Sequence, residues 1–334
     1  MQSDRPYTSL LTLLRLALGV GKQSVSLALS PDEWRDAYRM AAKHAVIAIA
    51  WDGVEQLQQH TPQMLQSMPA DLMGKWFADV HAIEAANSRM AKHTAQVQKL
   101  MSDGGFDSLV LKGATLAAYY PKPEHRQAAD IDLWLLPREA NQKSLKAQRQ
   151  ALKDYLRQQP EITVGEVVYH HIETIANGTE VELHVTPTWL CNPIHNCRLQ
   201  QLFSQAGGLS PELQELYTLL HAFRHIYHDG LALRHVMDYY LVCRHNRHEA
   251  IQAPEALYRQ LGLTCFARTM NELLGYLFGP QNADLLSGNA RHLLAALPQR
   301  QVARRVQWDY PAETLCVLPW RTIHYLWRKA NNYL

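Results

Sequence analysis

The sequence contains few of the features that mark secreted, membrane-spanning or nucleic-acid-binding proteins. Its five cysteines form an odd set without a CxxC pair, which argues against a disulfide framework and favours a reducing compartment. No segment approaches the roughly 20 apolar residues of a membrane span. The apolar stretch at residues 8–21 contains Arg15, so it indicates an amphipathic first helix rather than a signal peptide. We therefore expect a cytoplasmic protein with no membrane partner.

The chain also lacks an excess of charge of one sign. Its formal net charge is +2, from 33 Lys and Arg against 31 Asp and Glu, and the basic residues are spread along the sequence. Nucleic-acid-binding proteins usually gather basic residues into one patch or stripe. We therefore do not expect a long nucleic acid as partner, and small ligands remain open. Apolar residues make up 47% of the chain, as in an ordinary folded protein.

Three regions follow one another along the 334 residues. Residues 1–104 have helical periodicity, and Ser30 followed by Pro31 predicts a helix start there. Residues 105–207 contain short β-branched and leucine-rich runs. In residues 208–334 helical periodicity returns, after a second Ser-Pro start at Ser210. We expect an N-terminal helical region, a central domain with a sheet and a C-terminal helical bundle.

The central region predicts a small mixed sheet. "FDSLVLKG" and "ADIDLWLLP" are two short strands, each followed by a helical stretch. "EVVYHHIETIANGTEVELHV" predicts two further strands joined at Asn177-Gly178, a pair that strongly favours a tight hairpin turn. The fold class is therefore α+β, with a small mixed β-sheet flanked by N-terminal and C-terminal helical regions.

Acidic residues recur at a spacing of two within these strands. Asp130 and Asp132 point to one face of their strand, and Glu182 lies on one face of a later strand together with His184. If the strands are neighbours, three carboxylates converge and require a cation to relieve their repulsion. Oxygen donors of this kind suit Mg²⁺ or Mn²⁺. The alternative is that the two aspartates lie on the solvated face of a half-buried strand.

These residues occur together with other motifs, and the combination resembles a known family. "LVLKGATLAAYYP", an arginine, "ADIDLWL", "VELHVTPTW" and "HAFRHIYHDGLALRHVMDYY" resemble the uncharacterised nucleotidyltransferase family (NTP_transf_5) of the DNA polymerase β-like superfamily. The resemblance extends from about Leu109 to Tyr240. It implies a nucleotidyltransferase core and an enzyme that moves an NMP group from an NTP to a hydroxyl of a small-molecule or protein acceptor.

The resemblance also implies roles for individual residues. Asp130 and Asp132 match the paired aspartates that hold Mg²⁺ (or Mn²⁺), and Glu182 matches the third, catalytic carboxylate. Where the superfamily has Gly-Ser to bind the nucleotide phosphates, this chain has Lys112-Gly113-Ala114-Thr115. The nucleotide-binding residues that we expect are Lys112, Gly113, Thr115, Arg126 and Arg234.

Other interpretations of the basic residues and histidines remain open. Arg126 could form a structural salt bridge to Asp130 or Asp132, and Arg234 could pair with Asp238 four residues later on a helix. A non-catalytic nucleotide-binding sensor or protein-interaction scaffold on the same fold is the alternative function. A weaker alternative is a zinc site on the helix that carries His221 and His225, although the glutamate of an HExxH motif is absent there.

Overall fold

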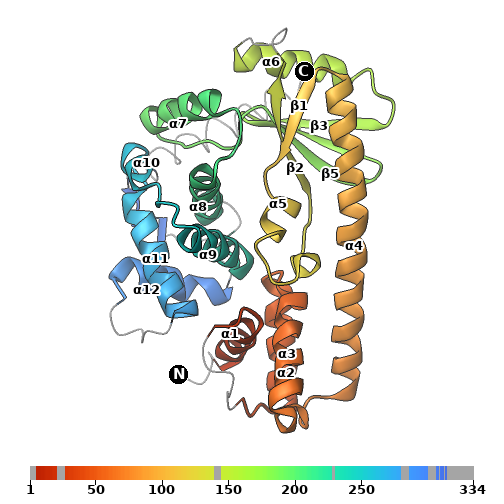
Figure 1. Cartoon of the computed structure of the whole chain (residues 1–334), viewed down its shortest axis with the longest axis vertical. Helices are drawn as coiled ribbons and strands as arrows, with labels where there is room; N and C mark the ends of the chain where they lie inside the picture. The colour runs from red at the N-terminus through yellow and green to blue at the C-terminus, as the bar shows by residue number, and fades with distance from the viewer. Residues whose placement is uncertain are drawn as a thin grey trace, which may run out of the picture.

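The computed structural model describes residues 5–20, 27–138, 144–227, 230–279, 286–299, 306–307, 309–311 and 313. Figure 1 shows a mixed sheet between the long helix α4 on one side and the helices of the C-terminal region on the other. The α+β class predicted from the sequence is confirmed. Within the described residues no helix is both long enough and apolar enough to span a membrane.

The N-terminal region is helical, as predicted. Ser30 caps α2 through a capping box, in which Glu33 N donates to Ser30 Oγ and Ser30 N donates to the Glu33 carboxylate. α4 contains 34 residues and ends before Gly104 and Gly105. The elements of this region are α1 (Arg5–Ala17), α2 (Pro31–Lys43), α3 (Ile47–His60), η1 (Pro62–Leu65) and α4 (Ala70–Asp103).

Five strands form one sheet in the order β1-β2-β5-β4-β3. β2 and β5 pair in parallel, and the other neighbours pair antiparallel. The predicted hairpin at Asn177-Gly178 is confirmed, because it joins β4 to β5 with φ angles of 49° and 76°. The strands are β1 (Phe106–Val110), β2 (Ile131–Pro137), β3 (Ile162–Val167), β4 (His171–Ala176) and β5 (Thr179–His184).

The segment before this hairpin differs from the prediction. One strand was expected there, but residues 168–170 separate β3 from β4. Val168 N donates to His171 O, and Val185 N donates to His170 O, so this turn is fixed by backbone bonds. Residues 168–170 contain no Gly, Pro, Asn or Asp, and the sequence therefore gave no turn signal.

The remaining helices follow β1 along the chain. They are α5 (Ala114–Ala117), η2 (Pro123–His125), α6 (Leu145–Leu156), α7 (Pro193–Ala206), α8 (Pro211–Tyr227), α9 (Leu233–His248), α10 (Glu255–Gln260), α11 (Thr264–Phe278), α12 (Gly288–Ala296) and η5 (Leu297–Gln299). α8 begins as predicted, since Leu213 N donates to Ser210 Oγ. The predicted bundle beyond Gln299 lies almost entirely outside the described residues.

The two faces of the sheet pack against different apolar cores. Leu133 and Leu183 join residues of α4 and α6 in the smaller core. Trp134, on the opposite face of β2, belongs to the larger core, and its ring lies 5.8 Å from that of Phe203 in α7. The larger core contains residues of both α1–α3 and α8–α12. The N-terminal and C-terminal helical regions therefore pack together, and the predicted boundaries after residues 104 and 207 stay predictions.

Candidate active site

Three carboxylates lie side by side across one face of the sheet. Asp132 on β2 is the direct partner of Glu182 on β5, and Glu182 is the direct partner of Glu173 on β4. Directly paired residues point to the same face. Two residues further on, the same face carries Trp134, His184 and His171. The strand order therefore makes β2 and β5 neighbours, the condition under which Asp132 and Glu182 were expected to meet.

Lys112 links the two aspartates. It lies in the loop between β1 and α5, and its Nζ is 2.8 Å from Asp132 Oδ1 and 3.8 Å from Asp130 Oδ2. Asp130 stands directly before β2. A single ammonium group within 4 Å of both carboxylates means that they face one common point. The predicted phosphate contact of Lys112 is thus an ion pair with the acidic residues in this structure.

His184 joins Asp132 to Glu182. Its Nε2 lies 3.1 Å from Asp132 Oδ1 and 3.2 Å from Glu182 Oε2, so one imidazole N–H is shared by two carboxylates. Asp132 is 1% exposed, and its Oδ2 has no hydrogen-bond partner among the described residues. A buried carboxylate oxygen without a partner is costly, and such atoms commonly mark the place of a ligand.

The charges in this cluster separate the pKa values of its acids. Burial raises the pKa of Asp130, and the nearby Asp132 and Glu182 raise it further against the effect of Lys112. Burial also acts on Asp132, but Lys112 and His184 outweigh it and lower the pKa of Asp132. The bond from His184 likewise lowers the pKa of Glu182 against burial. Asp132 and Glu182 therefore stay ionised more readily than Asp130.

The turn that carries Lys112 depends on Gly113. Its φ of 52° and ψ of −118° form a conformation that other L-residues rarely adopt. A Cβ at this position would have open space, with Val110 Cγ1 at 4.0 Å, so the backbone alone requires glycine. α5 has only four residues, and Thr115 Oγ1 donates to Val110 O at 2.7 Å. Thr115 therefore stabilises the turn in this structure.

Arg126 belongs to a second buried cluster of charges. Its Nε and Nη2 each lie 2.7 Å from an oxygen of Asp238 in α9, and Tyr120 Oη donates to Asp238 Oδ1 at 2.7 Å. The structural alternative for Arg126 expected Asp130 or Asp132 as the partner. The partner is Asp238 instead, because α9 brings it to the loop before β2. We call Tyr120, Arg126 and Asp238 the closed network.

Arg234 does not form the expected pair with Asp238, whose oxygens bind Arg126. Arg234 Nη1 donates to Gln127 O at 2.7 Å, and its buried Nε has no hydrogen-bond partner among the described residues. Burial and the charge of Arg126 lower the pKa of Arg234, while Asp238 and, less strongly, Asp130 raise it. Arg234 is therefore a cation near Asp130 with donor capacity left.

Comparison with known sequences decides which family carries this site. The sequence model described as "uncharacterised nucleotidyltransferase" matches residues 30–279, well over half of the chain. The chain belongs to this nucleotidyltransferase family. Its membership supports a general role in nucleotidyl transfer. No curated protein and no solved structure matches the chain.

Two further residues of this face are not predicted from the sequence. His171 and Glu173 lie on β4, opposite His184 and Glu182. Their spacing of two was visible in the sequence, but only the pairing of β4 with β5 shows that they share the face of Asp132. His170 precedes β4 and also contacts this cluster, with its ring 4.3 Å from that of His171.

A separate group of histidines lies on α8 and α9. His221, His225 and His235 each offer a nitrogen, and these nitrogens lie within 4.8 Å of one another. Burial and the charge of Lys112 hold the pKa of His221 well below its usual value. The family assignment favours nucleotidyl transfer over zinc-dependent hydrolysis, and a zinc site on His221 and His225 stays a prediction.

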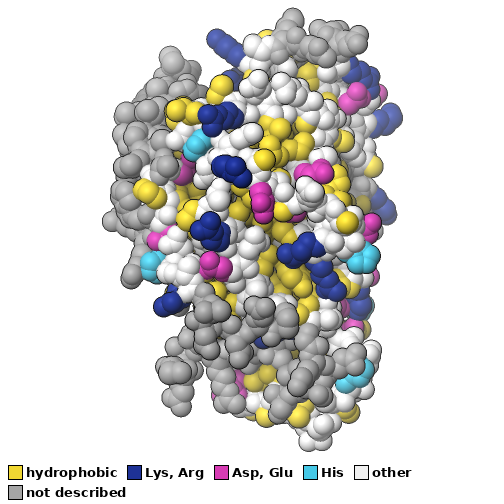
Figure 2. All heavy atoms as spheres, turned by 60° about the vertical axis from the view of Figure 1, so that its left-hand side comes forward, with side chains coloured by type: hydrophobic (Ala, Val, Ile, Leu, Met, Phe, Trp, Pro, Cys, Tyr) yellow, Lys and Arg dark blue, Asp and Glu magenta, His cyan; other side chains and the backbone are white. Residues whose placement is uncertain are grey.

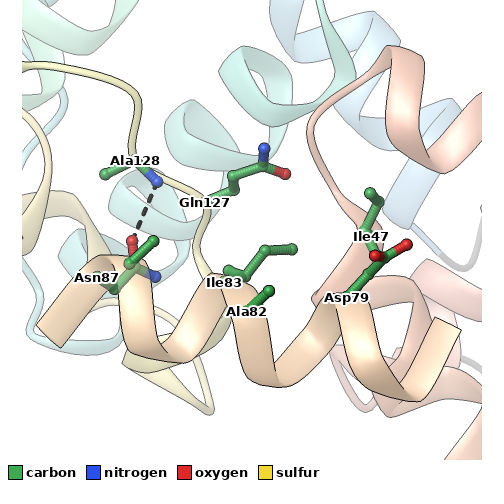
Figure 3. Close-up of a pocket in the computed structure, with 8 residues that line it drawn as sticks. Ile47, Asp79, Ala82, Ile83, Asn87, Gln127 and Ala128 are labelled. Atoms are coloured by element: carbon green, nitrogen blue, oxygen red, sulfur yellow. Dashed lines mark hydrogen bonds between the residues drawn. The ribbon is translucent and has the colours of Figure 1, made fainter. Parts of the chain in front are cut away.

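The described residues also form a cavity, whose lining does not include Asp130, Asp132 or Glu182, and a surface of mixed charge (Figure 2). A cavity of about 300 Å³ is bounded by α4 and by Gln127 and Ala128, in the loop that leads to Asp130. Figure 3 shows its lining, where Ala128 N donates to Asn87 Oδ1 at 3.3 Å. Figure 2 shows acidic and basic side chains interspersed around an apolar strip, without a broad patch of one sign on the described part of that face.

Proposed function

We propose that the protein transfers a nucleotidyl group from an NTP to a hydroxyl of a small-molecule or protein acceptor, with Mg²⁺ or Mn²⁺. The observation that carries this proposal is the joining of Asp130, Asp132 and Glu182 by one ammonium and one imidazole on a single sheet face. In a chain of a nucleotidyltransferase family, such a cluster of acids is the arrangement that phosphoryl chemistry needs.

The donors of the cluster fit a hard divalent cation. Asp132 Oδ2 is buried and lacks a hydrogen-bond partner among the described side chains and backbone, and carboxylate oxygens are the ligands that Mg²⁺ and Mn²⁺ prefer. Asp130, Asp132 and Glu182 would hold the ion. When bound, it would neutralise charge on the phosphates and stabilise the charge that develops there.

The remaining chemistry falls to the side chains themselves. The acceptor oxygen forms a bond to the α-phosphorus, the bond from that phosphorus to the oxygen bridging to the β-phosphate breaks, and pyrophosphate leaves. The hydroxyl proton passes to the carboxylate of Glu182, which His184 keeps ionised and oriented. Because His184 also binds Asp132, it fixes the two acids relative to each other.

Two cations stand beside Asp130 to bind the triphosphate. Lys112 is an ion-pair partner of Asp130, and Nε of Arg234 has no hydrogen-bond partner within the part of the chain that the structure describes. We assign the phosphate contacts to these two residues. Thr115 and Gly113 act through the turn that carries Lys112, because Thr115 Oγ1 donates to Val110 O and Gly113 has a positive φ. Arg126, which is paired with Asp238, contacts the same turn through Gly113 O at 3.5 Å.

The test is release of pyrophosphate from labelled ATP, GTP, CTP and UTP with Mg²⁺ or Mn²⁺, in the presence of metabolite and protein fractions as acceptors. Asp132→Asn should reduce release by about 10²–10³-fold while circular dichroism shows an unchanged fold. Asp107→Asn is the matched control, because Asp107 is an exposed aspartate of β1 that pairs with Arg138. Equal activity in Asp132→Asn and the wild type would refute the assignment.

A non-catalytic nucleotide-binding sensor or scaffold is the second candidate. The position of Lys112 favours it, because the ammonium already neutralises Asp130 and Asp132 where a cation would bind. This candidate predicts tight NTP binding without pyrophosphate release for every acceptor fraction. It also predicts that Asp132→Asn leaves nucleotide affinity nearly unchanged, whereas a metal-dependent transferase loses affinity together with activity.

A further inference from the structure

Three histidines form a cluster where α8 and α9 pack against each other (Figure 1). Their ring centroids lie between 3.9 and 5.1 Å apart, and each ring offers a nitrogen within 4.8 Å of the nitrogens of the other two. The members of this histidine cluster are His221 and His225, which are partly exposed, and His235, which is buried. A ligand can therefore reach imidazole groups that come from two different helices.

The surroundings of the histidine cluster are positively charged. Arg234 precedes His235 in α9, and its buried Nε has no hydrogen-bond partner within the described part of the chain. After burial, the groups with the largest effect on the pKa of His221 are Lys112, the two other histidines and Arg234, and all of them lower it. Positive charge is thus concentrated beside the histidine cluster, and such a place favours an anion over a metal ion.

One hydrogen bond fixes where His235 carries its proton. Ala232 N donates to His235 Nδ1 at 3.3 Å, so the lone pair of Nδ1 is occupied. With Nδ1 as the acceptor, the ring is neutral and its proton is on Nε2. To bind a metal ion through Nε2, the proton would have to move to Nδ1 and the bond from Ala232 N would be lost. His235 therefore presents Nε2 as a hydrogen-bond donor, which suits an anion.

The histidine cluster is connected to the reacting groups by two cations. Arg234 Nη1 donates at 2.7 Å to the backbone oxygen of Gln127, three residues before Asp130 in the chain. Lys112 Nζ lies 3.8 Å from Asp130 Oδ2, and its charge also acts on His221. Both cations are therefore close to the acidic cluster and to the histidine cluster. A chain of phosphates that begins at the acids would pass these cations and end at the histidines.

We propose that the histidine cluster and Arg234 bind the β- and γ-phosphates of the nucleoside triphosphate and hold pyrophosphate before it leaves. This inference rests on the proposed function, because it places the α-phosphate at the acidic cluster. Imidazole and guanidinium N–H groups donate to phosphate oxygens, and the charge of the guanidinium strengthens its bonds. Free inorganic pyrophosphate offers the same oxygens, so the experiment has to separate the two sources.

The test measures binding and requires no turnover. Inorganic pyrophosphate is titrated calorimetrically into the full chain without divalent metal, and ATP and AMP are titrated with Mg²⁺ in the absence of an acceptor. His221→Leu should weaken the binding of pyrophosphate and of ATP about 10-fold or more, because a hydrogen bond to a charged group is lost. Affinity for AMP, which lacks the terminal phosphates, should stay unchanged. His225→Leu, at the second partly exposed position, should give the same pattern.

A further variant separates anion binding from metal binding. His221→Gln keeps an N–H donor, but glutamine is not among the usual ligands of zinc. This variant should therefore recover most of the pyrophosphate affinity that His221→Leu loses. The matched control is His248→Gln, because His248 is an exposed histidine of α9 outside the cluster. The control should bind pyrophosphate, ATP and AMP like the wild type, and circular dichroism compares the folds of all variants.

Four results would overturn the inference. The first two are unchanged affinity for pyrophosphate and ATP in both leucine variants, and an equal loss of affinity for AMP. The third is a loss for pyrophosphate alone, since the cluster would then be a site for the free anion. The fourth is tight binding of Zn²⁺ by the wild type that is lost in both His221→Leu and His221→Gln, which would make the cluster a metal site.

Failure of this inference differs from failure of the proposed function. Asp132→Asn should reduce pyrophosphate release from ATP without weakening the binding of free pyrophosphate, because Asp132 does not contact the terminal phosphates in this arrangement. If no acceptor supports release but the leucine variants lose affinity as described, nucleotidyl transfer fails and the histidine cluster remains a terminal-phosphate site. If release occurs and the leucine variants bind ATP like the wild type, the inference fails alone.

Discussion

Two clusters of buried charge lie close together in this protein, and they differ in how completely their atoms are paired. In the closed network, Arg126 contacts both oxygens of Asp238 and Tyr120 contacts one of them. In the acidic cluster, Lys112 and His184 both contact Oδ1 of Asp132, and Oδ2 has no partner among the described residues. The first cluster is complete as folded, and the second needs a ligand.

The difference indicates what each cluster does. A buried ion pair with every oxygen satisfied fixes one arrangement of the elements it joins, here the loop before β2 and α9. A buried cluster with unsatisfied oxygens is unfavourable until a ligand binds. Both clusters combine aspartates with cations, so residue types alone do not tell a structural cluster from a ligand-binding one. Whether each carboxylate oxygen has a hydrogen-bond partner does tell them apart.

The largest effect on stability is expected in the closed network. Asp238→Asn leaves the guanidinium of Arg126 buried without a charged partner, which should lower the free energy of unfolding by about 3–5 kcal/mol. Urea denaturation followed by circular dichroism measures this change. Asp36→Asn, at a half-buried surface position of α2, is the control. A loss as small as that of the control would mean that the closed network is not a structural pair.

The second-largest difference between the clusters is expected in enzymatic activity, because a change in the acidic cluster should lower pyrophosphate release more than it lowers stability. Asp132→Asn should reduce pyrophosphate release by about 10²–10³-fold, because charge stabilisation at the reacting phosphate is lost. The midpoint of urea denaturation should change much less than in Asp238→Asn, since the acidic cluster is already incompletely paired. A variant that unfolds as easily as Asp238→Asn would remove the distinction between the two clusters.

A smaller effect is expected at His125, which precedes Arg126 of the closed network in the sequence. Its contribution to the free energy of unfolding should depend on pH. Burial lowers the pKa of His125, but its bond to Asp52 outweighs burial and the pKa is raised, with Glu84 contributing. Its stabilisation is therefore fully present below the unfolded pKa of about 6.5. It is lost as the pH rises through the raised folded value.

Urea denaturation across neutral pH measures this loss. His125→Asn should flatten the curve, whereas His248→Asn should not, because His248 is exposed. The opposite trend, a stability that rises with pH through this range in the wild type only, would contradict the raised pKa.

The smallest effect is expected for a charge pair without burial. Arg35 donates two hydrogen bonds to the carboxylate of Asp71, at 2.9 and 3.1 Å. This surface pair is bidentate, as is the buried pair of Arg126 and Asp238. Arg35→Ala should leave the denaturation midpoint unchanged within error, because exposed ion pairs are screened by solvent. A large shift would show that geometry, and not burial, gives the closed network its strength.

Much of the fold and part of the site could be predicted from local sequence. The capping box at Ser30 and the hairpin at Asn177-Gly178 follow from short-range geometry. Spacing along one strand also predicts that Glu182 and His184 share a face, whereas the meeting of Asp132 with Glu182 depends on the pairing of β2 with β5. The turn at residues 168–170 could not be predicted because it lacks turn residues. For that reason His171 was not recognised as part of the site.

The partners of the buried arginines could not be predicted from local sequence either. Arg126 had nearby aspartates at positions 130 and 132 as plausible partners, and its actual partner, Asp238, is 112 residues away. Arg234 was expected to pair with that aspartate within one helix. Neither partner could be chosen from the sequence, because the choice depends on where α9 lies relative to the loop before β2.

The sequence by itself determined which side chains share a face, because the alternation of side chains along a strand is a local property of the backbone. Only the tertiary structure decided which faces meet and which charges pair. Strand register and helix packing depend on contacts between residues far apart in the chain. These contacts give both carboxylate oxygens of Asp238 a hydrogen-bond partner, and they leave Oδ2 of Asp132 without one among the described residues.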